Sequence, residues 1–491
     1  MLEGMRLILA LGLPWLAAAL LLLRWWPCDA PGRWAGVLGV GYFLALFAVA
    51  GLLLGLDQLL GGWYTGAILA LAGLLALAGA WLARDPLLRV PAAQATPGGA
   101  LVASWATAAW WVRAAVLVLL ALIVVRMGGW LVEILWRPVY GWDAYYYWSY
   151  RARGFLEHGG ADAFVRPREL LRGGGEGYGQ YYRHPPLVSV IQMWPALALG
   201  RWHESLVNLP WFLAGSALGL AIYGYLRRLR LGILPATLAA YMTLSVPLLG
   251  VHVGLGGYAD IWMTGAFGIA ALALFTLFRE RRWQEWLVLL PLVLAIPFIK
   301  QAGILFATPF LLAVLLAWLR PWWGIALVVL LVAVGMGVAL LARVEVHLPI
   351  LGSVVLDAGR VVLPRGGELV FDPHWGMLFQ RLFLDGSWHL LFVLGSALLV
   401  LAVPQAWRQP AHRAVWVLMM AIAVMTLVAY GGTHQAGPML DGTGFGRHVL
   451  PLAPVIVAWL WLWLGDRLAD PRSSVPARNP GPVTSGGGHF D

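Results

Sequence analysis

Long apolar runs alternate with short polar segments from one end of the chain to the other. Each run is close to the roughly 20 residues that an α-helix needs to cross a bilayer. Lipid offers no partners to backbone N–H and C=O groups, so these runs must be helices. The pattern predicts an all-α, polytopic transmembrane protein with about thirteen spans, at residues 5–26, 34–56, 63–83, 113–136, 205–226, 233–251, 258–278, 284–298, 299–319, 322–343, 388–406, 413–430 and 446–464.

Composition excludes a water-soluble protein. Of the 491 residues, 61% are hydrophobic and only 11% are charged, whereas soluble domains carry about 25% charged residues. The net charge of +10 suits the anionic headgroups of a lipid bilayer, and no segment is typical of a nucleic-acid-binding module. Cys28 is the only cysteine, which excludes an intramolecular disulfide and a cysteine-rich metal site.

The arginines predict how the spans are oriented, because short loops rich in arginine face the cytoplasm. They recur in alternate loops, at Arg24, Arg33, Arg84, Arg89, Arg227, Arg228, Arg230, Arg279, Arg281, Arg282, Arg320, Arg408, Arg413 and Arg467. The short loops 57–62, 252–257 and 431–445 between them contain no arginine or lysine. We therefore expect the N-terminus and the long loops 137–204 and 344–387 outside, and the C-terminus in the cytoplasm.

Breaks in the apolar pattern divide the chain. Residues 1–84 hold three N-terminal helices, 85–112 form a cytoplasmic linker, 113–464 form the main transmembrane unit, and 465–491 form a disordered tail rich in Pro, Gly and Ser. Within the first long outer loop, the segment 185–200 is apolar but short and contains three prolines. We predict a helix on the membrane surface there, because another span would invert everything that follows.

Two carboxylates stand at predicted helix starts on the outer face. Asp143 opens an aromatic-rich segment, where the free N–H groups and the dipole of a helix would favour its anion. An ionised carboxylate at the membrane edge suits a general base; a helix cap beside an interfacial aromatic belt is the alternative. Asp260 opens a span, where a carboxylate at membrane depth indicates function unless it only starts the helix.

Cations lie on the same predicted face. Lys300, the sole lysine, interrupts the apolar stretch 286–318. Pro297 and Gly303 on either side of it would let two helices separate and expose the ammonium group. The alternative is that the lysine side chain snorkels to the membrane surface. Arg447, followed by His448, can bind a phosphate through two parallel hydrogen bonds, or be an arginine solvated at the interface. His184 precedes two prolines and is either a contact to sugar or phosphate or an exposed loop histidine.

These residues together resemble the GT-C superfamily of integral membrane glycosyltransferases, in particular the protein O-mannosyltransferase and lipid A aminoarabinose transferase branch. The matching motifs are Asp143 after Trp142, Tyr182-x-His184-Pro185-Pro186-Leu187, Asp260, Lys300-x-x-Gly303 and Arg447-x-x-Leu450-Pro451-x-x-Pro454. The resemblance covers about residues 113–464, so the three leading helices are additional. Asp143 stands alone where the family has a paired acidic motif, with Asp162 as a distant second carboxylate.

The resemblance implies transfer of a sugar from a polyprenyl-phosphate donor to a glycan, lipid or protein acceptor outside a bacterial or archaeal cytoplasmic membrane, with inversion. It implies that Asp143 is the general base and that Lys300 and Arg447 bind the lipid phosphate. The implied substrate pocket contains Tyr147, Trp148, His184, Asp260 and His448. Because two cations can hold a monophosphate, no cofactor is required, although a divalent metal is compatible with the family.

Other functions fit parts of the pattern. A transporter or lipid-sugar flippase is expected to show inverted repeats and charges at the midplane, whereas no convincing repeat is found and the charges cluster at one face. An O-antigen ligase or polymerase also handles lipid-linked sugars outside but need not carry an aspartate of this kind. A non-enzymatic scaffold would leave Lys300 without a purpose.

Overall fold

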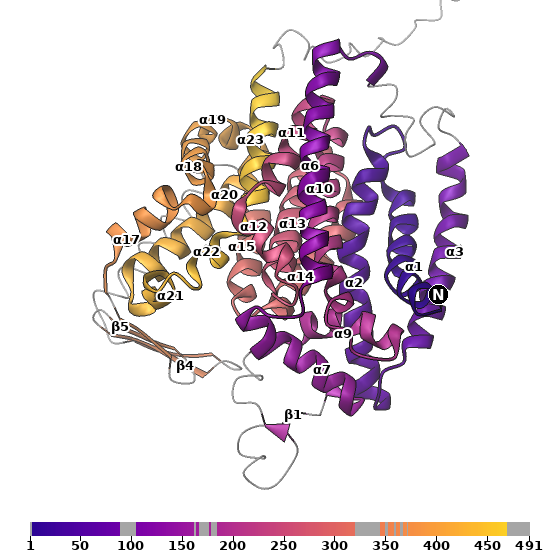
Figure 1. Ribbon diagram of the computed structural model, residues 1–491. Coiled ribbons are helices and arrows are strands. Elements are labelled where there is room, and N and C mark those ends of the chain that lie inside the picture. The colour runs from indigo at the N-terminus through magenta and orange to yellow at the C-terminus, as the bar shows by residue number, and fades with distance from the viewer. Residues whose placement is uncertain are drawn as a thin grey trace, which may run out of the picture.

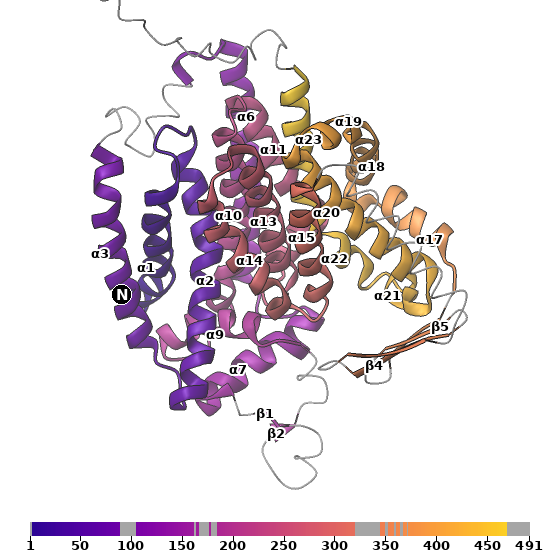
Figure 2. The same ribbon diagram turned by 180° about the vertical axis from the view of Figure 1, so that it is seen from behind.

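Helices form the body of the protein in the computed structural model, which describes residues 2–88, 105–161, 184–319 and 372–468 and short strands between them (Figures 1 and 2). Within these residues, seven helices are long and apolar enough to cross a membrane, which confirms a helical membrane protein. They are α1 (Leu2–Trp25), α2 (Arg33–Leu60), α3 (Thr65–Leu88), α6 (Trp110–Trp136), α10 (Leu209–Arg228), α13 (Asp260–Glu280) and α20 (Pro410–Thr426), the last continued by the π-helix η8 (Leu427–Gly431).

Several predicted spans are broken or shorter. The range 233–251 is the pair α11 (Ile233–Leu244) and α12 (Pro247–Gly254), bent by 65°, which counts as an eighth span if taken together. The others are α14 (Trp286–Ile299), α15 (Gly303–Trp318), α18 (Leu391–Leu401), α19 (Val403–Arg408), α22 (Phe445–Val449) and α23 (Leu452–Leu468). The predicted span 322–343, the linker residues 89–104 and the tail from 469 lie outside the described residues, so the count of thirteen stays a prediction.

The first long loop contains the π-helix η1 (Ala144–Trp148), α7 (Ser149–His158), α9 (Leu187–Leu199), the 3-10 helix η4 (Leu206–Asn208) and a parallel pair of two-residue strands, β1 (Phe164–Val165) and β2 (Glu176–Gly177). Helix α9 corresponds to the predicted surface helix, but almost all of its side chains are buried, against α7, α1 and α2. Trp194 of α9 donates its indole N–H to the Ala10 carbonyl at 2.8 Å. The segment is therefore a packed part of the bundle and does not merely lie on the membrane surface.

The second long loop contains a sheet that we did not predict. Strands β3 (Val344–Leu348), β4 (Gly352–Asp357), β5 (Arg360–Leu363) and β6 (Gly367–Val370) form an antiparallel meander in that order. The first strand alternates apolar and polar residues, a period of two that is typical of strands and was available in the sequence. The chain continues through α17 (Trp375–Phe379), the π-helix η6 (Gln380–Leu384) and the 3-10 helix η7 (Gly386–Trp388).

Contacts between loops divide the bundle into two ends. Arg230 pairs with Asp29 at 2.8 Å, joining two loops that were predicted to be cytoplasmic. Trp63, at the outer end of the predicted span 63–83, donates to the Phe155 carbonyl at 2.8 Å, in the loop 137–204 that was predicted to be outside. In Figure 1 the second set lies with α7 and the strands at the lower end of the bundle. The two predicted sets therefore separate, and which end faces the cytoplasm stays a prediction.

The leading helices are packed into the bundle by small residues. Gly39 of α2 lies so close to α10 that an added Cβ would be 2.3 Å from the Ala221 nitrogen. Gly36 and Gly224 approach in the same way one turn along. Tyr42 then donates from its hydroxyl to the Pro210 carbonyl at 3.0 Å. Small residues permit such close backbone contact, which is the main source of helix association in lipid.

We expect Gly39→Ala to destabilise the protein by about 1–3 kcal/mol, because the methyl group overlaps backbone atoms that cannot move independently. Gly51→Ala in the same helix is the matched control, since nothing lies within 4 Å of its Cβ position. Alanine favours helix over glycine by about 1 kcal/mol, so Gly51→Ala should be neutral or stabilising. Thermal unfolding in detergent compares the two; equal midpoints would contradict the packing.

Candidate active site

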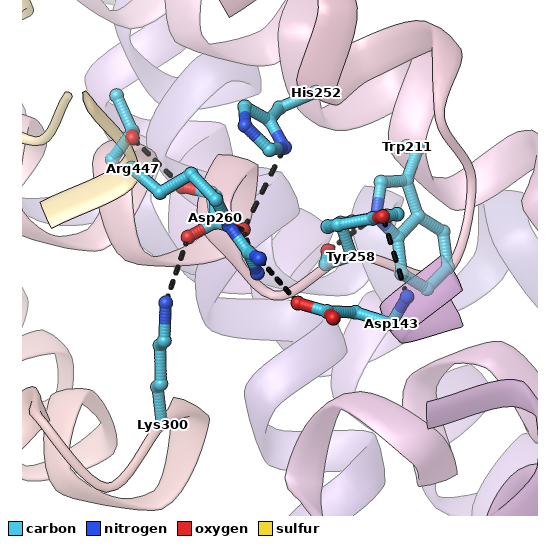
Figure 3. Close-up of polar contacts among 8 residues, drawn as sticks. Asp143, Trp211, His252, Tyr258, Asp260, Lys300 and Arg447 are labelled. Carbon is cyan, nitrogen blue, oxygen red and sulfur yellow. Dashed lines mark hydrogen bonds and ion pairs between the residues drawn. The ribbon is translucent and has the colours of Figure 1, made fainter. Parts of the chain in front are cut away.

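Charged residues from four distant segments form one chain of ion pairs (Figure 3). Asp260 Oδ1 accepts a hydrogen bond from Lys300 Nζ at 3.1 Å. Asp260 Oδ2 accepts from Arg447 Nε at 2.9 Å and lies 2.8 Å from Arg447 Nη2. Arg447 Nη1 in turn donates to Asp143 Oδ2. Two carboxylates and two cations therefore alternate within one centre.

A helix break places Lys300 in this centre. Helix α14 contains Pro297 and ends at Ile299, and Lys300 is extended, with φ −150° and ψ 150°. At Gly303, the first residue of α15, a Cβ would lie 2.1 Å from the Ile296 carbonyl oxygen, so only glycine fits this turn. The separation of two helices at Pro297 and Gly303, which the sequence predicted, is confirmed.

Burial differs sharply among the four residues. The Asp260 side chain is 2% exposed, whereas those of Asp143, Lys300 and Arg447 are 25%, 24% and 16% exposed. A buried carboxylate is stable only when paired and hydrogen-bonded, and both oxygens of Asp260 are occupied by the two cations. Asp260 is therefore placed to hold Lys300 and Arg447 in position. Its place in a substrate pocket, which the resemblance implied, stays a prediction.

Tyr258 contacts both Asp143 and Arg447, and sequence reasoning did not identify it as a site residue. Its hydroxyl accepts the backbone N–H of Asp143 at 3.3 Å, and the Arg447 guanidinium lies over its ring, 4.8 Å from the centroid. Its carbonyl accepts the indole N–H of Trp211 at 2.7 Å. A Cβ at Gly141 would lie 2.5 Å from the ring, so glycine is required there. The available signal was its position two residues before Asp260.

Aromatic rings surround His184. Its ring centroid lies 5.6 Å from Tyr147 and 5.1 Å from Trp148. Trp148 is buried, whereas Tyr147 is partly exposed. That these three residues line a sugar pocket stays a prediction. Buried Arg151 donates to the His184 and Pro185 carbonyls, both at 2.6 Å, and thereby ties this loop to α7.

His448 lies in an aromatic environment. Its ring packs against Phe306 and Tyr430, with both centroids at 5.0 Å. Among the described residues, no ion pair is found between His448 and Asp143 or Asp260. The place of His448 in a substrate pocket, which the resemblance implied, stays a prediction.

A cavity of about 220 Å³ lies next to the ion-pair centre. Its lining includes Arg447, Tyr258 and His252. Residues of η6, η7 and the loop before α22 also line it, among them Arg381 and Thr443. The centre therefore borders a space that can admit a small polar group.

The part of the chain that the structure describes contains no group of three or more His, Cys, Asp or Glu residues that could hold a metal ion. Asp162, the distant second carboxylate, lies outside the described residues.

The fold and composition define a helical membrane protein with a charged centre at one end of its bundle. The chain matches no protein-family profile, no curated protein and no solved structure. The resemblance to GT-C glycosyltransferases therefore stays a prediction that depends on the motifs and on the chemistry of this centre.

Burial lowers the pKa of His184 from 6.5 to about 4, and the nearby cations Lys300 and Arg151 add to the shift. Between these values the unfolded chain takes up a proton that the folded protein does not, so this contribution to stability is full above pH 6.5 and is lost as the pH falls towards 4. We expect His184→Gln to make the loss of thermal stability between pH 6.5 and 4 shallower. Exposed His389→Gln is the control; identical slopes for His184→Gln and wild type would contradict this environment.

Proposed function

We propose that this protein is a glycosyltransferase that moves a sugar from a polyprenyl-phosphate donor to an acceptor hydroxyl at the predicted outer face. One observation carries the proposal: a partly exposed carboxylate, Asp143, and two partly exposed cations, Lys300 and Arg447, belong to one network around buried Asp260. Inverting sugar transfer from a phosphate needs this set, a base for the acceptor and cations for the leaving group.

Lys300 and Arg447 stabilise the leaving phosphate. As the bond between the anomeric carbon and the phosphate oxygen breaks, both bonding electrons stay on that oxygen and its negative charge grows. Cations that are already held in place stabilise this charge without having to reorganise during the reaction. Asp260 supplies that preorganisation, because its two carboxylate oxygens bind the two cations.

Asp143 is the base. The acceptor oxygen attacks the anomeric carbon from the side opposite the phosphate, and its proton passes to the Asp143 carboxylate, which inverts the carbon. Arg447 binds Asp143 before substrate arrives. A donor phosphate that binds Arg447 then competes with the Asp143 carboxylate for the guanidinium. The ion pair between Arg447 and Asp143 becomes weaker. Donor binding would in this way release the base for the acceptor.

A lipid-sugar flippase is the second candidate, because broken helices such as α11–α12 with its 65° bend are a feature of transporters. The two functions differ in their product. Purified protein in liposomes, with a labelled polyprenyl-phosphate sugar and a cell-envelope extract as acceptor, forms a new glycosidic bond only if it is a transferase. A label that changes leaflet without changing its chemical form supports the flippase.

We expect Asp143→Asn to lower transfer by about 10²–10⁴-fold, the usual contribution of a general base, while the donor still binds. The amide keeps the shape of the side chain but cannot take the proton. Transfer of labelled sugar and equilibrium binding of the labelled donor are measured on the same preparation. Glu157→Gln, an exposed acid in the same outer segment, is the control. Full activity of Asp143→Asn would remove Asp143 from the base role.

Lys300→Met should lower the rate on the order of a hundredfold, since loss of one preorganised contact to developing charge raises the barrier by about 3 kcal/mol. Lys300→Arg should recover part of this loss, because the positive charge beside Asp260 is restored. Rates with saturating donor are compared for the three proteins. Equal rates for Lys300→Met and Lys300→Arg would show that the charge itself has no part in the reaction.

A further inference from the structure

A second arginine lines the cavity of about 220 Å³ together with Arg447. It is Arg381, in the π-helix η6. Sequence reasoning did not select it, since it lies in the second long loop without a recognisable motif.

Arg381 is held in place but keeps donors for a ligand. Its Nε donates to the Met439 carbonyl at 3.2 Å, and its Nη1 lies 3.7 Å from Asp385 Oδ2, longer than a direct charge-assisted hydrogen bond. A guanidinium has five N–H donors, so these contacts do not exhaust it. Asp385 also lines the cavity and accepts the backbone N–H of Ser387 at 2.9 Å. Its negative charge is the one group there that opposes an anion.

The loop before α22 makes room for this guanidinium. Gly442 has a φ of +76°, and a Cβ there would lie 3.0 Å from Arg381 Nη2. Thr443 donates from its backbone N–H and its hydroxyl to Asp441 at 2.9 and 2.7 Å, which stabilises the turn. π-Helical turns are rare and are frequent at functional sites, and both η6 with Arg381 and η1 after Asp143 border this region.

A second hollow, of about 470 Å³, adjoins the first and shares Arg381 and Asp385 with it. Its wall includes Phe379 and Leu384, which are 57% and 70% exposed. An apolar surface therefore leads to Arg381, and the cavity beyond leads to Arg447. This order, apolar outside and cationic inside, is complementary to an amphiphile that has a hydrocarbon chain and an anionic head.

We propose that these two hollows receive the polyprenyl-phosphate donor, with its chain along Phe379 and Leu384 and its phosphate between Arg381 and Arg447. The inference rests on the proposed function and adds the path of the donor and a third cation on its entry side. Arg381 meets the phosphate first, Arg447 binds it at the inner end, and Lys300 acts from beyond Asp260.

The test is equilibrium binding of radiolabelled polyprenyl monophosphate to the full-length protein in phosphatidylcholine nanodiscs. Arg381→Gln should weaken binding about tenfold or more, because a charge-assisted contact is lost while the amide can still donate to the Met439 carbonyl.

Polyprenol, which has the chain without the phosphate, should bind wild type and Arg381→Gln equally. Leu384→Ser should weaken both ligands. Arg137→Gln is the control, since Arg137, like Arg381, is paired with an acid four residues away but is exposed and lines neither hollow, and it should bind as wild type does.

Other outcomes overturn the donor path, the donor assignment or the proposed function. Unchanged binding by Arg381→Gln, together with weaker binding by Lys300→Met, overturns the path proposed here and leaves the proposed function standing. Wild type that does not bind polyprenyl monophosphate overturns both. Equal competition by phosphatidylglycerol would mean a general site for anionic lipid, and equal competition by inorganic phosphate would mean a site for the free ion. Either result overturns the donor assignment.

Discussion

The pairing of one buried carboxylate with two cations is the constraint on which the rest of this centre depends. Asp260 is almost completely buried, and an unpaired carboxylate there would cost several kcal/mol. Lys300 and Arg447 compensate its charge, and they come from the break after α14 and from α22. Three helix ends are therefore held in one arrangement by electrostatics within an apolar bundle. The same pairing leaves the outer sides of both cations available.

Helix breaks create the places where charge can exist in such a bundle. Backbone irregularity at membrane depth is tolerated only where protein groups bind the freed carbonyls or where it lines a cavity. At the bend between α11 and α12, Arg126 donates to the Val246 carbonyl at 3.3 Å. At the break after α14, the extended backbone presents Lys300. In the proposed reaction, the same irregularity that weakens the helices supplies the groups that bind the donor.

The proposed chemistry also explains why the centre is balanced before substrate binds. Asp143 and Asp260 together neutralise Arg447 and Lys300, so these four side chains together carry no net charge in the free protein. A donor phosphate adds one more anion to Arg447, which then interacts less strongly with Asp143. In the proposed reaction, a single guanidinium couples donor binding to release of the base. That guanidinium lies over the Tyr258 ring in the free protein.

Hydropathy determined that this is a helical membrane protein, and the arginine pattern indicated which loops share an end, because burial of backbone in lipid and the charge rule act on local sequence. Pro297 and Gly303 likewise indicated the break at Lys300, and the shared predicted face brought Asp143, Asp260, Lys300 and Arg447 into one hypothesis. Only the tertiary structure decided that Asp260 bonds both cations, that Tyr258 and Arg381 line the cavity beside Arg447, and that the His448 ring packs against Phe306 and Tyr430. The reason is geometric. Sequence periodicity and charge indicate how deep a residue lies in the membrane. Its neighbours on other helices depend on which helix faces pack together, as at Gly39 and Ala221.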